Sequence, residues 1–248
     1  MADGISIVIP VLNEADELPG LIESLCPFAS EAEIVFVDGG SVDASAAIIR
    51  AAGYRLVTAA PGRARQMNAG ARATRRDLLL FLHADVRMPA DALGAIHAAM
   101  HDRRVVAGRF DLGYDTRAWP YPWIAWFGNQ RSRLTGIFTG DQTIFVRRSA
   151  FVAVGRYPDI ALMEDVELSR RLKRRGRLAC LRARVSASTR KCRREGVWRT
   201  LALMWLLRTL YAFGVAPSRL HRLYYRRDPA KRTAQVVGGP RSHDAGSP

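Results

Sequence analysis

The chain has 248 residues, of which 48% are hydrophobic and 25% charged, and its formal net charge is +15. This length and composition support a full hydrophobic core, most simply in one domain, and exclude a wholly disordered chain. The positive charge belongs to the later part, because residues 1–146 hold 14 Lys and Arg against 16 Asp and Glu, whereas residues 147–248 hold 24 against 7. We therefore expect a polyanionic partner, such as nucleic acid, an anionic membrane or a phosphorylated substrate, unless the surface is simply rich in arginine.

The cysteines and the N-terminus indicate a cellular compartment. Cys26, Cys180 and Cys192 are odd in number and widely spaced, which argues against a disulfide framework or a zinc site and fits a reducing cytoplasm. The N-terminus enters the apolar run ISIVIPV without a basic leader, which argues against a secretory signal. We expect a cytoplasmic protein.

The first hundred residues alternate between strand and helix signals. Strands are predicted at 5–11, 33–37, 55–58, 78–83 and 105–111, and helices at 17–25, 44–52, 63–73 and 90–101. The strand segments are nearly continuous apolar runs, as parallel strands covered on both faces require. The pattern predicts an α/β fold, a Rossmann-like and mostly parallel sheet with helices on both faces.

Acidic residues stand where these apolar runs stop. Asp38 closes one run, Asp85 closes another, and Glu164 and Asp165 open a helical stretch. If the two runs are neighbouring parallel strands, their carboxylates emerge together at the carboxyl edge of the sheet, where such folds bind ligands. Crowded carboxylates favour a divalent cation with a phosphorylated ligand, although a single Asp is more often a helix cap or turn residue.

An aromatic segment follows at 118–130. A long connection rich in aromatic residues and proline is typical of a lid or a binding wall. Trp119, Tyr121, Trp123 and Trp126 could stack on a sugar or a base, or they could pack in the core or against a membrane.

The C-terminal part is predicted to contain an apolar helix and a mobile tail. Residues 201–216 are apolar but would reach only about 24 Å and contain Arg208, so they are too short and too charged for a membrane span. They could lie in the interface of an anionic membrane, since arginines flank them, or form a buried helix packed on the sheet. We divide the chain into a main domain (1–195), an apolar and basic helical segment (196–230) and a mobile tail (231–248).

Five motifs occur in an ordered series. They are VIPVLNE at 8–14, VDGGSVD at 37–43, GRARQMNAGARA at 62–73, HAD at 83–85 and MEDVELSRRLKRRG at 163–176. Over residues 5–195 this series resembles the family 2 glycosyltransferases of the GT-A fold. GDQTIFVRR and the closing apolar helix are also similar to a small bacterial subgroup labelled arsenosugar-biosynthesis-like glycosyltransferases. The resemblance implies inverting transfer of a sugar from a nucleoside diphosphate, UDP in particular, to an acceptor hydroxyl, with Mg²⁺ or Mn²⁺.

The resemblance also implies a donor site. Its residues would be Pro10, Asn13, Glu14, Asp38, Gly40, Arg63, Asn68, His83 and Ala84. The carboxylate of Asp38 suits the N–H of a uracil-like ring or ribose hydroxyls, and Gly39 and Gly40 let the backbone pass close to the ligand. Arg63 and Arg65 could reach phosphate, although one of them is more simply a solvent-facing residue.

The metal motif departs from the family pattern. HAD replaces an Asp-X-Asp signature, so His83 stands at the first acidic position and Asp85 keeps the metal-binding position. A hard cation prefers oxygen ligands and needs few from the protein when a diphosphate supplies others. His83 could contact ribose, ligate Mn²⁺ or only cap the strand.

The acceptor side is implied by later residues. Asp165 matches the general base that takes the proton of the acceptor hydroxyl, and Glu164 would orient or bind the acceptor. Both acids could instead only favour the helix dipole. Further acceptor or diphosphate contacts are expected from Asp141, Gln142, Arg190 and Arg194.

Two other classes of protein remain as alternatives. A nucleotidyltransferase acting on sugar phosphates would carry a glycine-rich basic loop after the first strand, where this chain reads PVLNEADEL. A non-catalytic basic module would use the later half to bind nucleic acid or membrane, but no nucleic-acid motif accompanies the charge. The expected partners are a nucleoside diphosphate sugar and a hydroxyl acceptor, which could be lipid-linked, with peripheral contact at the inner face of a membrane.

Overall fold

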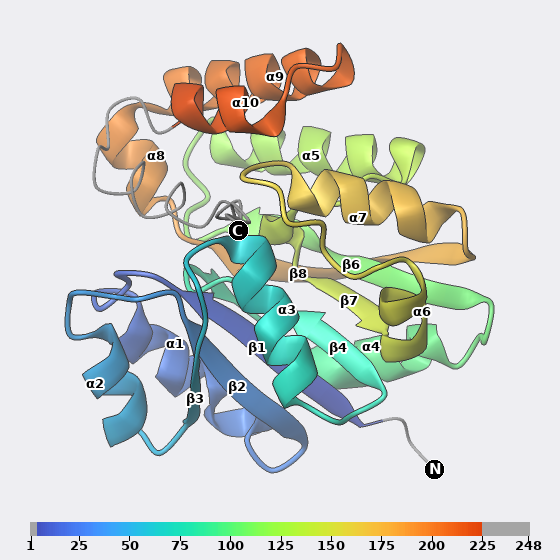
Figure 1. Cartoon of the computed structure of the whole chain (residues 1–248). Coiled ribbons are helices and arrows are strands. Elements are labelled where there is room, and N and C mark those ends of the chain that lie inside the picture. The colour runs from blue at the N-terminus through green and yellow to red at the C-terminus, as the bar shows by residue number, and fades with distance from the viewer. Residues whose placement is uncertain (1–3, 225–248) are drawn as a thin grey trace, which may run out of the picture.

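The computed structural model describes residues 4–224, so the predicted tail and the end of the 196–230 segment lie outside the described residues. Figure 1 shows one twisted sheet with helices on both faces. The strands are β1 (Ile5–Val11), β2 (Ala32–Asp38), β3 (Arg55–Thr58), β4 (Leu78–Phe81), β5 (Val86–Arg87), β6 (Val105–Tyr114), β7 (Ile144–Arg147) and β8 (Arg177–Ala187). Their order in the sheet is β3-β2-β1-β4-β7-β6-β8-β5.

The sheet is mostly parallel, which confirms the predicted α/β class. β1 pairs in parallel with β2 and β4, and β6 pairs in parallel with β8. β7 runs antiparallel to both of its neighbours, β4 and β6. The predicted neighbours β2 and β4 are in fact separated by β1, so that expectation was wrong in detail. Their carboxyl ends still lie at one edge of the sheet, because all three strands are parallel.

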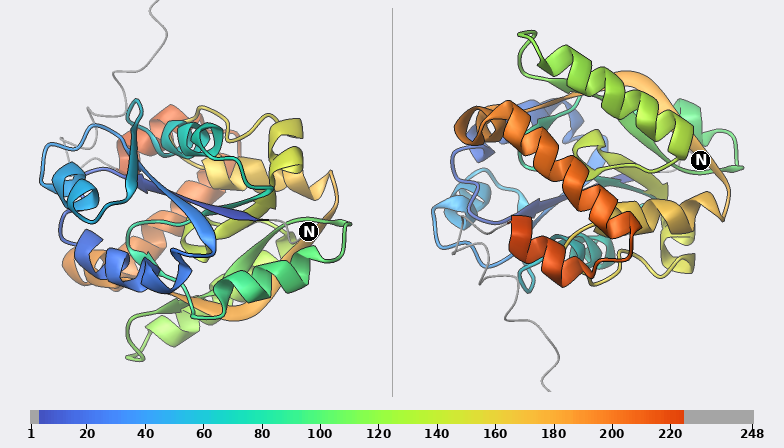
Figure 2. Two further views of the ribbon diagram at one scale, coloured as in Figure 1. Left: turned by 90° about the horizontal axis from the view of Figure 1, so that it is seen from below. Right: turned by 90° about the horizontal axis from the view of Figure 1, so that it is seen from above.

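Helices cover the sheet on both sides. They are α1 (Leu18–Leu25), α2 (Ser45–Ala51), α3 (Arg63–Ala73), α4 (Ala92–Met100), α5 (Tyr121–Thr135), α6 (Arg148–Ala153), α7 (Glu164–Lys173), α8 (Arg190–Glu195), α9 (Val197–Ala212) and α10 (Pro217–Tyr224), with 3-10 turns η1 (Cys26–Phe28) and η2 (Gly140–Gln142). Alternate residues of β1 serve opposite faces: Ile7 and Ile9 join a core with α1 and α4, whereas Val8 joins a core with α3 and α7. Figure 2 shows these two helix layers from below.

The aromatic segment is mainly a helix, so the prediction of a long connection was wrong. Pro120 lies at the start of α5, and Gly136, at φ 68°, ends it in the left-handed conformation. Ala125, Asn129 and Ser132 are buried on one side, at the spacing of a helix face. The segment lacks the usual pattern of an amphipathic helix because tryptophans occupy its exposed face.

The apolar C-terminal segment forms two helices that pack on α7. Leu207 of α9 and Leu220 of α10 are buried in a cluster with Met163 and Val166. The predicted alternative of a helix buried on the sheet was therefore wrong, because α7 lies between. Within residues 4–224, none of the helices has both the length and the apolar character needed to cross a bilayer.

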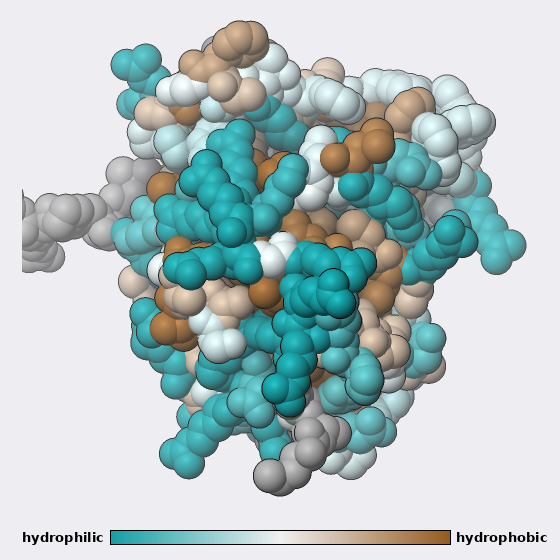
Figure 3. All heavy atoms as spheres, turned by 90° about the vertical axis from the view of Figure 1, so that its right-hand side faces the viewer, coloured by the Kyte–Doolittle hydropathy of each residue, from teal (hydrophilic) through white to brown (hydrophobic). Residues whose placement is uncertain are grey.

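Part of the positive charge of the later half is spread over the surface. Figure 3 shows a largely hydrophilic side of the molecule, the side on which α7 ends. Exposed cations at and after the end of α7 include Arg170, Lys173, Arg174, Arg175 and Arg177. The net charge thus does not belong to a single binding site.

Candidate functional site

The carboxyl edge of the sheet gathers segments from both halves of the chain. β1, β2 and β4 end here, followed by residues 12–14, 39–41 and 83–85. Because β7 is antiparallel to β4, it begins at this edge, and the 3-10 turn Gly140–Gln142 precedes it. The predicted motifs of the early and later halves therefore meet at one edge.

The start of α7 is attached to this turn. The carboxylate of Asp165 accepts hydrogen bonds from the backbone N–H groups of Gly140, at 2.9 Å, and Val166, at 2.7 Å. Ser169, one turn further along α7, accepts a hydrogen bond from the N–H of Phe138 at 3.0 Å. Two side chains of one helix face thus hold the turn before β7 against α7.

His83 packs against the other side of the same turn. A Cβ added to Gly140 would lie 2.3 Å from His83 Cε1 and 2.5 Å from Nε2, so only glycine fits beneath the ring. Burial lowers the pKa of His83 to about 3, the Arg63 cation adds to this effect, and Asp141 opposes it. The imidazole is therefore neutral at pH 7 and retains a nitrogen lone pair.

The two adjacent acids of α7 differ in their surroundings. Burial, followed by the charge of Asp165, raises the pKa of Glu164 to about 7, and the Arg63 cation opposes this shift. Burial also raises the pKa of Asp165, but the N–H of Gly140 and the cation of Arg208 favour its charged form. A carboxyl group with a pKa near neutrality suits proton transfer.

Two arginines that sequence reasoning missed lie close enough to act on this cluster. Burial, followed by the nearby Arg208 cation, lowers the pKa of Arg131 to about 10, while Asp141 and Asp165 oppose that shift. Within the described residues, Arg131 Nε and Asp141 Oδ1 are buried and lack a hydrogen-bond partner. Such unsatisfied atoms call for a ligand or water. The sequence offered one indication that Arg208 has a role, which is that it is a charged residue within the apolar helix α9.

The predicted nucleoside side is held together by its own loops. Asp38 accepts hydrogen bonds from the backbone N–H of Ser41 at 3.1 Å and from its hydroxyl at 2.6 Å. Asn13, at φ 55°, donates its N–H to the Ser41 hydroxyl and accepts from the N–H of Val42. Pro10 lies buried within β1 rather than after it. Asp38 thus accepts the hydrogen bonds that hold the turn after β2, and its contact with a ligand stays a prediction.

The neighbouring positions Glu14, Gly40 and Ala84 lie at the same edge. The N–H of Glu14 donates to the hydroxyl of Ser45 at 2.9 Å, which ties the loop after β1 to α2. Gly40 has φ 91°, which favours glycine, and nothing occupies the space of a Cβ there. Ala84 is buried between His83 and the exposed Asp85.

Gln66 is a supporting residue that the sequence did not reveal. Its side-chain amide donates to the carbonyl of Val11 at 2.7 Å and to that of Val37 at 2.8 Å. Val11 is the last residue of β1, and Val37 is the last but one of β2. Gln66 therefore joins the ends of the two strands, directly beneath Gly39. Only the packing of α3 across both strands creates this contact.

Two residues of α3 that were predicted to bind the sugar donor form contacts within the protein. The amide of Asn68 donates to the carbonyl of Tyr157 at 2.8 Å and accepts from its N–H at 3.1 Å. Arg65 pairs with Asp159 at 2.8 Å. Asn68 therefore holds the 157–159 segment, and its contact with a ligand stays a prediction, while Arg63 is exposed next to Glu164.

Gln142 is likewise turned inward. Its Oε1 accepts from Thr139, and its Nε2 donates to Asn129 and Ser132 of α5, all at 3.1–3.3 Å. The side chain is 1% exposed. It forms a capping box that shapes the turn, and ligand contact stays a prediction for both Gln142 and Asp141.

The two predicted arginines of α8 have different positions. Arg190 pairs with Asp16 at 2.9 Å and with Glu17 at 3.1 Å, which places it beside the segment after β1. Arg194 is exposed and lies 3.8 Å from Glu195. Only Arg190 is tied to the carboxyl edge, and contact of either arginine with a diphosphate stays a prediction.

Within residues 4–224, the acidic side chains form no ready-made metal cage. No group of three or more His, Cys, Asp and Glu in this part of the chain is close enough to hold a metal ion. Asp85 is exposed, its backbone carbonyl accepts from Ser188, and its carboxylate makes no hydrogen bond to the described residues. Asp85, and the unsatisfied oxygen of Asp141, fit a hard cation that takes its other oxygen ligands from a diphosphate.

A cavity of about 530 Å³ adjoins the acids of α7. Its wall includes Arg63, Asp159, Glu164, His221 and Arg222, from the start of α3, the segment before α7 and α10. Asp165 is absent from this wall and instead faces Gly140. The carboxyl group of Glu164 thus lines the cavity, whereas that of Asp165 faces the turn at Gly140, as expected for successive residues at a helix start.

Comparison with known proteins identifies the family. The sequence model of Glycosyl transferase family 2 matches residues 6–156, so this chain belongs to that family. Curated relatives include the undecaprenyl-phosphate 4-deoxy-4-formamido-L-arabinose transferases of Pseudomonas fluorescens, 36% identical over 123 residues, and Pseudomonas paraeruginosa, 34% identical over 133 residues. These alignments cover 45% and 48% of this chain and 33% and 39% of the relatives. The chain thus spans little more than a third of their length.

Solved structures confirm the GT-A fold. The mannosyltransferase PcManGT from Pyrobaculum calidifontis, in complex with GDP-Man and Mn²⁺, has a TM-score of 0.66 at 18% identity, covering 96% of this chain and 74% of its own. S. aureus TarS in complex with UDP-GlcNAc gives 0.61 at 17% identity, covering 75% and 59%. Glucosyl-3-phosphoglycerate synthase from Mycobacterium tuberculosis, with Mn²⁺ and UDP, gives 0.56 at 18% identity, covering 75% and 72%.

Proposed function

We propose that this chain transfers a sugar from a nucleoside diphosphate donor, a UDP-sugar in particular, to an acceptor hydroxyl by a single displacement that inverts the anomeric centre. The observation that carries this proposal is the attachment of Asp165 to Gly140, on which the ring of His83 rests. It brings a carboxylate from the later half of the chain to the residues that follow β4. Family membership supports the reaction class.

The nucleoside is proposed to bind beside Asp38, Asn13 and Gly40. The carboxylate of Asp38 accepts hydrogen bonds from donors such as those of a ribose or a base, and the hydrogen bonds that it accepts from Ser41 orient it. Arg63 lies where the start of α3 and Glu164 share a cavity, so it can meet a phosphate or the sugar.

A divalent cation, Mg²⁺ or Mn²⁺, would be held by Asp85 with help from Asp141 and the neutral imidazole of His83. When bound, it supplies positive charge to the diphosphate. Arg131 and Arg208 contribute further positive charge next to Asp141 and Asp165. Fixed cations around a departing diphosphate stabilise the negative charge that grows in the transition state.

Asp165 is the proposed general base. It would take the proton of the acceptor hydroxyl while the acceptor oxygen attacks the anomeric carbon and the bond to the diphosphate breaks. The N–H of Gly140 and the Arg208 cation favour its ionised form, as a base requires. Glu164, with a pKa raised to about 7 and a place in the cavity wall, is proposed to orient the acceptor.

The acceptor could be lipid-linked. The curated relatives are named for undecaprenyl phosphate, which supports a lipid carrier as the class of acceptor. The oxygen of a phosphate monoester is already largely ionised at pH 7 and needs no base. Dependence on Asp165 therefore separates a hydroxyl acceptor from a phosphate acceptor.

Thermal unfolding in the presence of candidate donors tests the proposal. The chain is screened against nucleoside diphosphate sugars, with and without Mn²⁺, and the true donor should stabilise it by about 2.7 kcal/mol at a hundred times its Kd. A donor that stabilises the chain is then incubated with candidate acceptors, and release of nucleoside diphosphate is measured. Stabilisation by no donor would contradict the proposal. Release of pyrophosphate from a nucleoside triphosphate and a sugar phosphate would instead identify a nucleotidyltransferase.

A further inference from the structure

Exposed apolar side chains gather on two helices. Of the eleven large hydrophobic residues that are exposed within residues 4–224, eight lie on α5, on the turn before it, or on α9, and a ninth, Phe213, directly follows α9. The other two, Val42 and Val152, stand apart from these helices. Isolated exposed apolar residues are normal, but a concentrated patch indicates an interaction surface.

The outward stripe of α5 is aromatic. Trp123, Phe127 and Leu134 are 58%, 58% and 85% exposed, and their spacing of four and seven residues places them along one helix face. The opposite face, with Ala125 and Asn129, packs on β6. α5 therefore presents an apolar stripe to the surroundings as well as to the core.

Helix α9 is apolar on two sides. Its inner face buries Leu207 against Met163. Its outer face carries Trp198 and Trp205, at 60% and 58% exposure, and Phe213, at 84% exposure, directly follows the helix. A helix that is hydrophobic all round is normally covered on all sides, whereas residues 4–224 leave the outer face of α9 exposed.

The two helices present these residues on one side of the molecule. The rings of Trp119, just before α5, and Trp198, at the start of α9, are 5.4 Å apart. The right-hand view of Figure 2, from above, shows both α5 and α9 on the side that faces the viewer. We call this surface the α5–α9 face.

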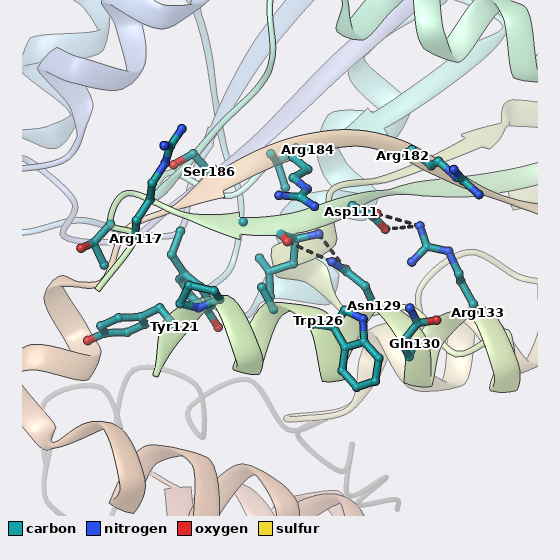
Figure 4. A pocket seen from close by; sticks show the side chains of 17 residues that line it. Asp111, Arg117, Tyr121, Trp126, Asn129, Gln130, Arg133, Arg182, Arg184 and Ser186 are labelled. Atoms are coloured by element: carbon teal, nitrogen blue, oxygen red, sulfur yellow. Dashed lines mark hydrogen bonds and ion pairs between the residues drawn. The ribbon is translucent and has the colours of Figure 1, made fainter. Parts of the chain in front are cut away.

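Cations border the α5–α9 face. Residues 190–224 contain eight Lys and Arg and one acidic residue, Glu195. A groove of about 810 Å³ between α5 and β8 is lined by Trp126 together with Arg117, Arg182 and Arg184 (Figure 4). The guanidinium groups of these three arginines form no ion pair or hydrogen bond with the described residues, whereas that of Arg133 in the same wall is held by Asp111.

We propose that the α5–α9 face is the surface by which this chain lies on an anionic lipid bilayer. The tryptophans and Phe213 enter the interfacial layer, and Arg117, Arg182 and Arg184 meet lipid phosphates. A 16-residue helix, about 24 Å long, that exposes apolar residues beside cations is suited to lie in this plane. A second copy of the chain would set like charges against each other, whereas an anionic surface complements them. The proposal does not depend on the transferase reaction.

Vesicle binding with paired variants tests the apolar part. The wild-type chain should sediment with vesicles of phosphatidylcholine mixed with phosphatidylglycerol, and much less with phosphatidylcholine alone. Replacing Trp205 and Phe213 by serine should lower the partition coefficient by roughly tenfold or more, because both side chains lose their burial in lipid. The matched control replaces Val152, which is exposed on α6 and stands apart from these helices, by serine and should bind as the wild type does.

A second pair of variants tests the cationic part. Arg182→Ser with Arg184→Ser should weaken binding to the anionic vesicles roughly 30-fold, since each arginine near such a surface contributes about a factor of five. Arg50→Ser with Arg72→Ser removes the same charge from exposed positions on α2 and α3 and should change binding far less. All four variants should keep the wild-type thermal shift with the donor, which separates membrane docking from catalysis.

Several results would overturn the proposal. Absence of vesicle binding, or equal loss in the test and control variants, would show that this face does not dock on lipid. A dimer seen by light scattering that the Trp205 and Phe213 variant disperses would assign the face to a second copy. Salt-sensitive binding of RNA that needs the three arginines, without vesicle binding, would assign it to nucleic acid.

Discussion

Gly140 lies directly beneath the imidazole of His83, at a distance that leaves no room for a Cβ, while its N–H donates to the carboxylate of Asp165. One glycine therefore separates the histidine that follows β4 from the acid that begins α7. Because residue 140 has no side chain, His83 on the proposed metal side can lie close to the turn that holds Asp165, the proposed base.

Gly140→Ala should disturb both contacts. The new Cβ would lie 2.3 Å from His83 Cε1, so the ring or the turn must shift, with a loss of stability on the order of 1–3 kcal/mol and a larger fall in transfer. Gly94→Ala is the control, because Gly94 lies in α4 with nothing within 4 Å of an added Cβ. It should stabilise the chain by about 0.5–1 kcal/mol, as urea unfolding can measure. Equal effects of the two variants would contradict the tight contact.

Asp165→Asn should abolish transfer to a hydroxyl while donor binding persists. The amide cannot take the proton, so the rate should fall about 10²- to 10⁴-fold, with an unchanged thermal shift from the donor. Glu164→Gln should cost less, mainly through acceptor binding. Rates as large as the wild type in Asp165→Asn would exclude this base, or indicate that the acceptor is an already ionised phosphate.

Glu164 should make stability depend on pH. Its pKa is raised from 4.5 to about 7 on folding, so the folded chain binds this proton more tightly than the unfolded chain. The resulting stabilisation is complete below pH 4.5 and is lost as pH rises through 7, by an amount of up to about 3 kcal/mol. Urea unfolding at pH 5 and 8 should show a smaller difference for Glu164→Gln than for the wild type. The exposed Glu23→Gln should not change the difference.

Gln66→Glu should destabilise the carboxyl edge. A carboxylate cannot donate to the carbonyls of Val11 and Val37, and it would be buried against two acceptors, at a cost of about 2–5 kcal/mol. Gln130→Glu, the same change at a partly exposed position of α5, should stay within about 1 kcal/mol of the wild type. Comparable stability of the two variants in urea would argue against the clamp.

Asp85→Asn should remove the dependence of donor binding on metal. If Asp85 helps to hold the cation, the additional thermal shift that Mn²⁺ gives with the donor should be lost, and the shift without metal should remain. Asp91→Asn changes an exposed acid before α4 and should retain the Mn²⁺ effect. A full Mn²⁺ effect in Asp85→Asn would place the metal elsewhere.

The strand and helix pattern of the early half was predictable because it depends on local residues. β3 and α3 have the predicted bounds, and β1 also agrees, since buried apolar runs and the glycine before α3 act locally. The order β2-β1-β4 was not predictable in the same way, because pairing is decided by distant residues. α5 was missed because its exposed face is aromatic instead of polar.

The position of the site was predictable from acids at strand ends, but its supports were not. Nothing near Gln66 or Gln142 in sequence reveals that their amides face carbonyls or side chains from other elements. Arg131 and Arg208 reach the acids only because α5 and α9 fold over that edge. The hydrogen bonds of Asn68 with Tyr157 are long-range contacts of the same kind.

The meeting of two parts of the chain at one edge of the sheet has a consequence for how the proposed acceptor could be changed. The residues proposed for the donor side lie in the part that matches the family, 6–156, whereas the acids of α7 and the helices that pack on it come from the remainder. Exchange of the segment after Tyr157 for that of a relative would leave the turns that we propose for nucleotide binding in place. Such a chimaera offers a route to a new acceptor range with the original donor.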